Sequence, residues 1–152
     1  MAKELKTGDK APLFEAETDG GGKVSLSDII AEGGTAICFY PRDNTPGCTR
    51  EACSLRDSED AIRGKGITVL GISTDSVKSH DGFKNKHELN YTLASDSDRK
   101  IIELYGIASP SNTARRVTFL VDGKGVIRHI WKKVDTHSHG DEILKKIEEL
   151  SL

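Results

Sequence analysis

The stretch YPRDNTPGCTREAC, residues 40–53, marks the turn from a buried strand into a helix. Thr45 is a good N-cap residue and Pro46 suits the first helical position, so a helix is predicted to begin here. Cys48 then falls in the first turn, where unpaired backbone N–H groups and the positive end of the helix dipole stabilise an anion. Thiols in such positions ionise more readily than free thiols, and the thiolate is the form that attacks electrophiles. Cys48 is therefore a candidate nucleophile.

Two short apolar runs rich in β-branched residues flank this helix, at Thr35–Tyr40 and Ile67–Ser73. The segment between them, Pro46–Arg63, has helical periodicity and is closed by Gly64. Strand, helix and strand in this order predict a βαβ unit with parallel strands.

The second half of the chain changes from alternating strands and helices to a hairpin and a final helix. The expected elements are helices near Ser76–Lys86 and Asp98–Tyr105, a strand near Tyr91–Ala94, strands at Arg116–Val121 and Val126–Trp131 around the turn DGKG, and a last helix at His139–Leu150. A βαβ unit followed by ββα is the order of the thioredoxin fold. We therefore predict an α/β fold with a central mixed sheet flanked by helices, preceded by an N-terminal extension.

The length of the chain indicates a single domain, residues 1–152, and its charge indicates no surface for a strongly charged partner. A chain of 152 residues is the size of a single domain. Its net charge is −2, with both signs interspersed, so neither nucleic acid nor a membrane is expected to bind. The charged segment Met1–Lys10 lacks the apolar core of a signal peptide, and no run of 18 apolar residues occurs. We expect a soluble, cytoplasmic protein.

The three cysteines favour redox use over a structural disulfide framework, because their number is odd and the expected compartment is reducing. Cys38 lies inside the apolar run AICFY, residues 36–40, and is expected to be a small buried strand residue that does not react in the folded protein.

The motif around Cys48 resembles the active site of the peroxiredoxins, in which Pro41, Thr45 and Cys48 form the signature around the peroxide-reducing thiol. With Cys53 five residues after Cys48, the pattern is similar to the peroxiredoxin Q group, also called bacterioferritin comigratory proteins. The similarity extends over nearly the whole chain, through Lys6–Phe14, Leu70–Asp75, Arg116–Asp122 and Lys132–Leu144. The resemblance implies an antioxidant thiol peroxidase that reduces hydrogen peroxide and organic hydroperoxides.

The resemblance also assigns roles. Cys48 would attack the peroxide and become a sulfenic acid, which Cys53, the resolving cysteine, would convert to a disulfide. Thr45 would bind peroxide and could also cap the helix through its hydroxyl, and Pro41 would shield the thiol from water. Residues five apart in an unbroken helix have Cα atoms about 8.6 Å apart, beyond the ~7 Å limit for a disulfide, so the segment 47–55 must unwind.

Peroxide reduction also needs a group that stabilises the thiolate and the departing oxygen. In the family an arginine from a distant strand does this, and the matching position is Arg116. Its neighbour Arg115 would point to the opposite face of a strand, so only one of the two can face the thiol.

Glu51 follows Cys48 by one turn and would by itself disfavour a thiolate, so its expected role is to hold an arginine in place. From the sequence, Arg42, Arg50 and Arg56 are equally suitable partners.

The resemblance implies a thioredoxin-like dithiol protein as reductant, and the chemistry requires no cofactor and no metal. A monomer is expected, because an internal disulfide between Cys48 and Cys53 removes the chemical need for a partner subunit without forbidding a dimer. Two other functions stay open. A general dithiol-disulfide exchanger would reduce insulin disulfides without peroxide, although the spacing of Cys48 and Cys53 differs from CxxC. A metal-binding or redox-sensing module could use both cysteines with His137 and His139, which are expected to be surface residues of a loop.

Overall fold

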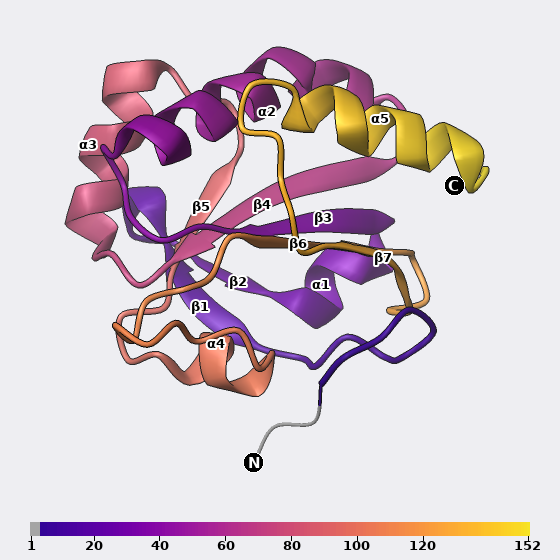
Figure 1. The fold of residues 1–152 in the computed structure, drawn as a ribbon, viewed down its shortest axis with the longest axis horizontal. Helices are drawn as coiled ribbons and strands as arrows, with labels where there is room; N and C mark the ends of the chain where they lie inside the picture. The colour runs from indigo at the N-terminus through magenta and orange to yellow at the C-terminus, as the bar shows by residue number, and fades with distance from the viewer. Residues whose placement is uncertain (1–3) are drawn as a thin grey trace.

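Among residues 4–152, which the computed structural model describes, seven strands form one mixed sheet in the order β2-β1-β5-β4-β3-β6-β7 (Figure 1). The strands are β1 (Glu15–Thr18), β2 (Lys23–Ser25), β3 (Gly34–Phe39), β4 (Ile67–Ser73), β5 (Thr92–Ser95), β6 (Val117–Val121) and β7 (Ile127–Trp131). The helices are the 3₁₀ turn η1 (Asp19–Gly21), α1 (Leu26–Ala31), α2 (Pro46–Arg63), α3 (Val77–His87), α4 (Lys100–Leu104) and α5 (His139–Glu149).

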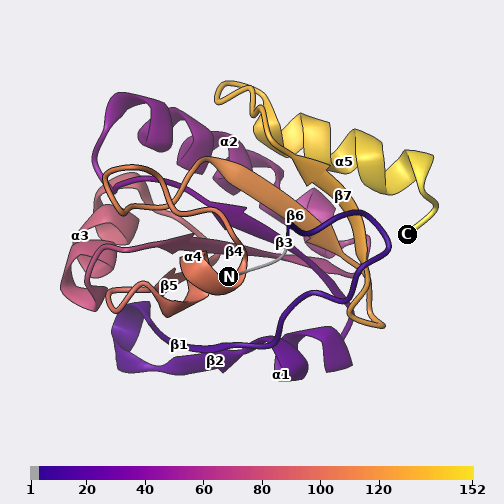
Figure 2. The ribbon, with the colours of Figure 1, turned by 60° about the horizontal axis from the view of Figure 1, so that its bottom comes forward.

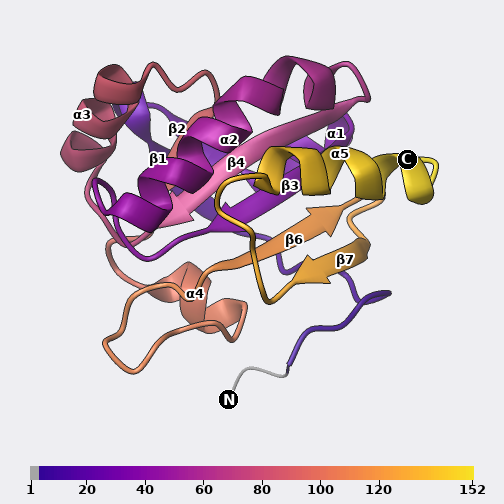
Figure 3. The ribbon, with the colours of Figure 1, turned by 45° about the horizontal axis from the view of Figure 1, so that its top comes forward.

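Helices cover both faces of the sheet, and each face has its own apolar core. Alternate residues of β3 point to opposite sides, so Ala36 and Cys38 join the core under α2 and α5, whereas Ile37 and Phe39 join the core under α1 and α4. Figure 3 shows α2 and α5 side by side over the sheet, and Figure 2 shows α4 in front of the opposite face.

The predicted βαβ unit and C-terminal hairpin are both present. β3 pairs in parallel with β4 and antiparallel with β6, and β6 pairs antiparallel with β7. The helix between β3 and β4 runs from Pro46 to Arg63, with Gly64 at its C-terminal cap, as the sequence predicted. The thioredoxin-like fold is thereby confirmed.

Helix α4 is shorter than the predicted Asp98–Tyr105. The buried carboxylate of Asp96 accepts hydrogen bonds from the backbone N–H groups of Ile101 and Ile102, at 3.0 and 2.9 Å. Arg99 has a φ of 63°, outside the right-handed helical region, so regular helix begins only at Lys100.

The sequence predicted an N-terminal extension but not the strands and helix that it contains. It consists of the hairpin β1–β2 and the short helix α1, and β1 pairs antiparallel with β5 at one side of the βαβ unit. The Ser25 side chain caps α1 by accepting from the Asp28 backbone N–H at 3.2 Å. In the part of the chain described here, no helix has the length and apolar character needed to cross a membrane.

Candidate active site

The candidate nucleophile lies where the loop after β3 enters α2. Cys48 is in the first helical turn and is 2 % exposed. The helix starts at Pro46, and the Thr45 carbonyl accepts the backbone N–H of Thr49 at 2.8 Å. The local sequence therefore predicts the helix start correctly and puts the thiol at the positive end of the helix dipole.

Arg116 reaches Cys48 from the position just before β6. Its Nη2 donates to Cys48 Sγ at 3.3 Å, and its Nη1 donates to Glu51 Oε1 at 2.5 Å. The strand register explains this approach, because Val117 is paired with Phe39 and the start of β6 therefore lies beside the end of β3. One guanidinium thus joins the thiol and a carboxylate that stand one helical turn apart.

Arg115 points elsewhere. Its Nε donates to the Ala108 carbonyl at 3.1 Å, on the other side of the strand end. Of the two adjacent arginines, the structure therefore brings Arg116 to the thiol.

Glu51 is 2 % exposed, and its second oxygen, Oε2, has no hydrogen-bond partner among the described residues. Burial raises the pKa of Glu51 to about 7, although the charge and hydrogen bond of Arg116 act in the opposite direction. The carboxylate does hold an arginine, but this arginine is Arg116.

The three partners considered from the sequence are engaged differently. Arg56 binds Asp57 and the carbonyl of His87, and Arg50 donates to Thr136. Arg42 is exposed, and its carbonyl accepts the Thr45 hydroxyl. None of these three is the partner of Glu51, because folding brings Arg116, 65 residues away along the chain, to the carboxylate.

Gly47 makes room for the guanidinium, a role that sequence reasoning missed. A Cβ at this position would lie 3.2 Å from Arg116 Nη2, closer than most real Cβ contacts. The glycine was visible in the motif, but its function depends on a residue that folding brings from far along the chain.

Thr45 and Pro41 belong to the loop that leads to Cys48. Thr45 occupies the N-cap position, yet its side chain makes no capping hydrogen bond, because its hydroxyl donates to the Arg42 carbonyl at 2.9 Å. The predicted capping by the hydroxyl is therefore wrong. Pro41 is half-buried at the start of the same loop.

All three cysteines are free thiols. Cys53 is half-buried and lies on the same unbroken helix as Cys48, so the two cannot be joined without unwinding α2. Cys38 is 1 % exposed on β3, as expected, and burial raises the pKa of its thiol well above the ordinary value. It lines a small cavity of about 10 Å³ together with Cys48 and Glu51.

Of the two histidines considered as metal ligands, His137 lies where it was expected and His139 does not. His137 is exposed, but His139 is fully buried at the start of α5. Its Nε2 lies 2.8 Å from Thr118 Oγ1 and its Nδ1 2.9 Å from Glu142 Oε1, so packing of α5 on β6 buries it. Burial lowers the pKa of His139, against the raising effect of Glu142.

Within residues 4–152, the one group of three or more potential metal ligands in mutual reach is Asp43, Asp75 and His80. It contains neither a cysteine nor the two histidines above. Sequence reasoning missed this group, since no short spacing connects its members.

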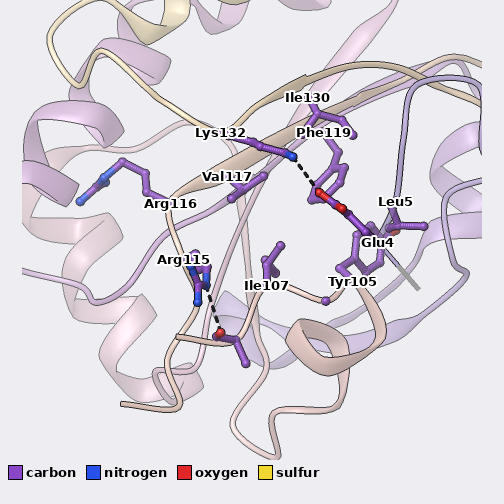
Figure 4. Close-up of a pocket in the computed structure, with 12 residues that line it drawn as sticks. Glu4, Leu5, Tyr105, Ile107, Arg115, Arg116, Val117, Phe119, Ile130 and Lys132 are labelled. Carbon is purple, nitrogen blue, oxygen red and sulfur yellow. Dashed lines mark hydrogen bonds and ion pairs between the residues drawn. The ribbon is translucent and has the colours of Figure 1, made fainter. Parts of the chain in front are cut away.

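A cavity of about 500 Å³ lies beside the arginine pair, on the face of β6 opposite the thiol. Its walls include the apolar residues Tyr105, Ile107, Val117, Phe119 and Ile130. Figure 4 shows that Arg116 borders this cavity but directs its guanidinium away from it. Glu4 and Lys132 form an ion pair of 2.8 Å at the rim.

A thioredoxin-like sheet with a buried thiol bound by an arginine at a helix start is the framework of a thiol-dependent peroxidase. Comparison with known proteins agrees, since residues 7–130 match the family described as AhpC/TSA. The chain belongs to this family, and thiol-dependent reduction of peroxides is its activity.

The similar proteins are peroxiredoxins. The chain is 41 % identical over 150 residues to a putative peroxiredoxin Bcp of Coxiella burnetii, covering 94 % of this chain and 99 % of the relative. It is 37 % identical over 152 residues to peroxiredoxin Bcp of Escherichia coli K12, covering 95 % and 97 %.

Among solved structures, BcpB of Mycobacterium tuberculosis superimposes with a TM-score of 0.89 at 28 % identity, covering 97 % of this chain and 99 % of the other. A cysteine-to-serine mutant of PrxQ from Xylella fastidiosa gives a TM-score of 0.91 at 28 % identity, with coverages of 99 % and 100 %.

Proposed function

We propose that Cys48 is the thiol that reduces the peroxide and that Arg116, Thr45 and Pro41 complete its site. The observation that carries this proposal is the pair of hydrogen bonds from Arg116 to Cys48 Sγ and Glu51 Oε1. A guanidinium is always charged and offers several donors in a fixed plane, so it can hold a thiolate and a peroxide oxygen together. Glu51 keeps it in place.

In the first step the Cys48 thiolate attacks one oxygen of the hydroperoxide. The S–O bond forms as the O–O bond breaks, and the departing oxygen takes up a proton and leaves as water or an alcohol. The sulfur becomes a sulfenic acid. Arg116 stabilises the negative charge on the departing oxygen, while the oxygen of the Thr45 hydroxyl, whose proton is donated to the Arg42 carbonyl, can accept the peroxide O–H. Pro41 shields the Cys48 thiolate from water.

In the second step Cys53 attacks the sulfenic sulfur. The Cys48–Cys53 disulfide forms and the hydroxyl leaves as water, after the start of α2 has unwound. A thioredoxin-like dithiol then reduces the disulfide by exchange and becomes oxidised itself.

We also propose that the chain works as a single-domain monomer on hydrogen peroxide and organic hydroperoxides. An internal disulfide removes the chemical need for a second subunit. A cytoplasmic location fits a reaction that starts from free thiols, because reducing compartments keep cysteines in that form.

The test is intact mass and peptide mapping of the reduced protein after one equivalent of hydrogen peroxide. We expect the loss of two hydrogens and a link between Cys48 and Cys53. The variant Cys53→Ser should instead retain a sulfenic acid at Cys48, and Cys48→Ser should show neither product. A slow or absent reaction at Cys48, with reduction of insulin disulfides by the same protein, would favour the disulfide-exchange function.

Unwinding is tested separately by amide hydrogen exchange. Residues 47–55 should exchange faster in the disulfide form than in the reduced form, because their helical hydrogen bonds are lost. Equal exchange in the two forms would contradict the unwinding step.

A further inference from the structure

The loop that carries Pro41 and Thr45 is attached to α3 by a buried polar cluster that the chemistry above does not use. Asp43, in the middle of this loop, is its centre. The carboxylate accepts from Tyr40 Oη at 2.6 Å and from Ser79 Oγ at 2.8 Å, and His80 Nδ1 lies 2.8 Å from Oδ2. We call Tyr40, Asp43, Asp75, Ser79 and His80 the Asp43 cluster.

Asp75 ties the backbone of the same loop. Its Oδ2 accepts the backbone N–H of Asp43 at 2.8 Å and the Ser73 hydroxyl at 2.7 Å. Backbone and side chain of Asp43 are thus both held from the β4–α3 side of the molecule. This explains how Asp43 can be 8 % exposed in an otherwise more open loop.

His80 makes two contacts that require two N–H groups. Nδ1 faces the Asp43 carboxylate, and Nε2 lies 3.0 Å from the Ala94 carbonyl of β5. A neutral imidazole has a single N–H and would turn a lone pair toward one of these oxygens, whereas an imidazolium donates to both. The side chain is 0 % exposed, so its charge is balanced by Asp43 rather than by water.

Both charged neighbours of the ring, Asp43 and Asp75, favour the proton. Burial alone would lower the pKa of His80, but the hydrogen bond and charge of Asp43, the Ala94 carbonyl and the charge of Asp75 together raise it above 6.5. The remaining titratable neighbour is the hydroxyl of Tyr40, 3.4 Å from Nδ1 at the end of β3.

The loop that Asp43 anchors contains a residue in an unfavourable backbone conformation. Asn44, which separates Asp43 from Thr45, has a φ of 64°, a left-handed conformation that non-glycine residues adopt at a cost. The contacts around the loop must offset this conformational free energy. Loss of the anchor beside Asn44 would let the loop relax and move Thr45.

We propose that His80 is a positioning residue for the peroxide reaction, whose imidazolium fixes Asp43 and thereby the loop that places Pro41 and Thr45 beside Cys48. This inference rests on the proposed function, which assigns those two residues to the peroxide site. Asp43, Asp75 and His80 could also be read as cation ligands, but both ring nitrogens and three of the four carboxylate oxygens already take part in hydrogen bonds within the protein. The hydrogen-bonded arrangement is therefore preferred.

The experiment compares wild type with His80→Asn by stopped-flow reaction of the fully reduced proteins with hydrogen peroxide between pH 5.5 and 9. Asparagine can replace the Nδ1 donor but supplies neither the charge nor the contact with Ala94. The matched control is His87→Asn, on the same helix, where the ring packs edge-on against Phe83.

The decisive quantity is the ratio of wild-type to His80→Asn rate constants, which cancels the ionisation of the attacking thiol. We expect a ratio of about 10–100 near pH 6, since small misplacements of a site can cost about 100-fold, falling toward 1 as His80 loses its proton at high pH. His87→Asn should stay near 1 throughout. A ratio near 1 at every pH, or a large ratio independent of pH, would overturn the proposal.

Nitrogen NMR of the wild-type imidazole makes the test independent of whether the variant folds. At pH 5.5, below the ordinary pKa of histidine, both ring nitrogens of His80 should be protonated, and a neutral ring there would contradict the proposal. Failure of the proposed function is recognised separately, because in that case wild type itself forms no sulfenic acid or disulfide at Cys48.

Discussion

Replacement of Arg116 by glutamine removes the charged group that donates a hydrogen bond to the candidate thiol. In the folded protein this guanidinium donates to Cys48 Sγ at 3.3 Å and to Glu51 Oε1 at 2.5 Å. Arg116→Gln should therefore affect two separate quantities, the rate of peroxide reduction and the free energy of unfolding.

The effect on rate follows from the hydrogen bond to sulfur. A hydrogen bond that involves a charged group contributes about 1.5–3 kcal/mol, and each 1.36 kcal/mol of lost stabilisation slows a reaction about tenfold. The second-order rate constant for hydrogen peroxide should thus fall about 10- to 150-fold, as measured by single-turnover stopped flow.

The effect on stability follows from Glu51, whose side chain is 3 % exposed. Above about pH 7, where Glu51 is ionised, removing one partner of a buried ion pair costs about 3–5 kcal/mol, and the partial exposure of Arg116 favours the lower end, about 3 kcal/mol. For a chain of this size that corresponds to a melting temperature about 6–12 °C lower. The double variant with Glu51→Gln should regain most of this stability, because no buried carboxylate is left unpaired, but it should not regain the rate.

Arg115→Gln is the matched control, since it makes the same change at the neighbouring position, where the side chain contacts the Ala108 carbonyl. It should change the rate less than about threefold. Equal losses in the two arginine variants, or recovery of the rate in the double variant, would refute the reasoning about this site.

Three further predictions concern the core and pH. Cys38→Ala should leave the peroxide rate constant unchanged and lower the unfolding free energy by about 1 kcal/mol in urea titrations, because Cys38 is a buried strand residue. Gly140→Ala should lower the unfolding free energy by about 1–3 kcal/mol, since the added Cβ would lie 2.6 Å from the Ser54 carbonyl oxygen. Gly82→Ala should instead stabilise α3 by about 0.5–1 kcal/mol in the same assay, because a Cβ there would have no atom within 4 Å. As the pH rises from 5 to 7, wild type should lose stability relative to Glu51→Gln. The reason is that the folded protein keeps the Glu51 proton up to about pH 7, while the unfolded chain releases it near 4.5. If urea titrations show that the unfolding free energies of the two proteins change in parallel with pH, the prediction is contradicted.

Several features of this protein depend only on neighbours along the chain, and they could be predicted from the sequence. The start of α2 at Pro46, its end at Gly64 and the position of Cys48 in the first turn follow from capping preferences and helical period. The hairpin β6–β7 follows from alternation around a turn, and the buried place of Cys38 follows from its apolar surroundings. These are short-range properties, so they require no knowledge of the packing.

Which distant groups meet became visible only in the folded chain. The pairing of Phe39 with Val117 brings Arg116 to Cys48 across 68 residues, whereas the family pattern could only indicate that arginine as a candidate. Folding also made Arg116 the partner of Glu51 and joined Asp43 to His80, 37 residues away, for which no motif was visible. The physical reason is that strand register and helix packing position whole elements at once. The residue types of two distant side chains do not indicate how the elements that carry them are aligned.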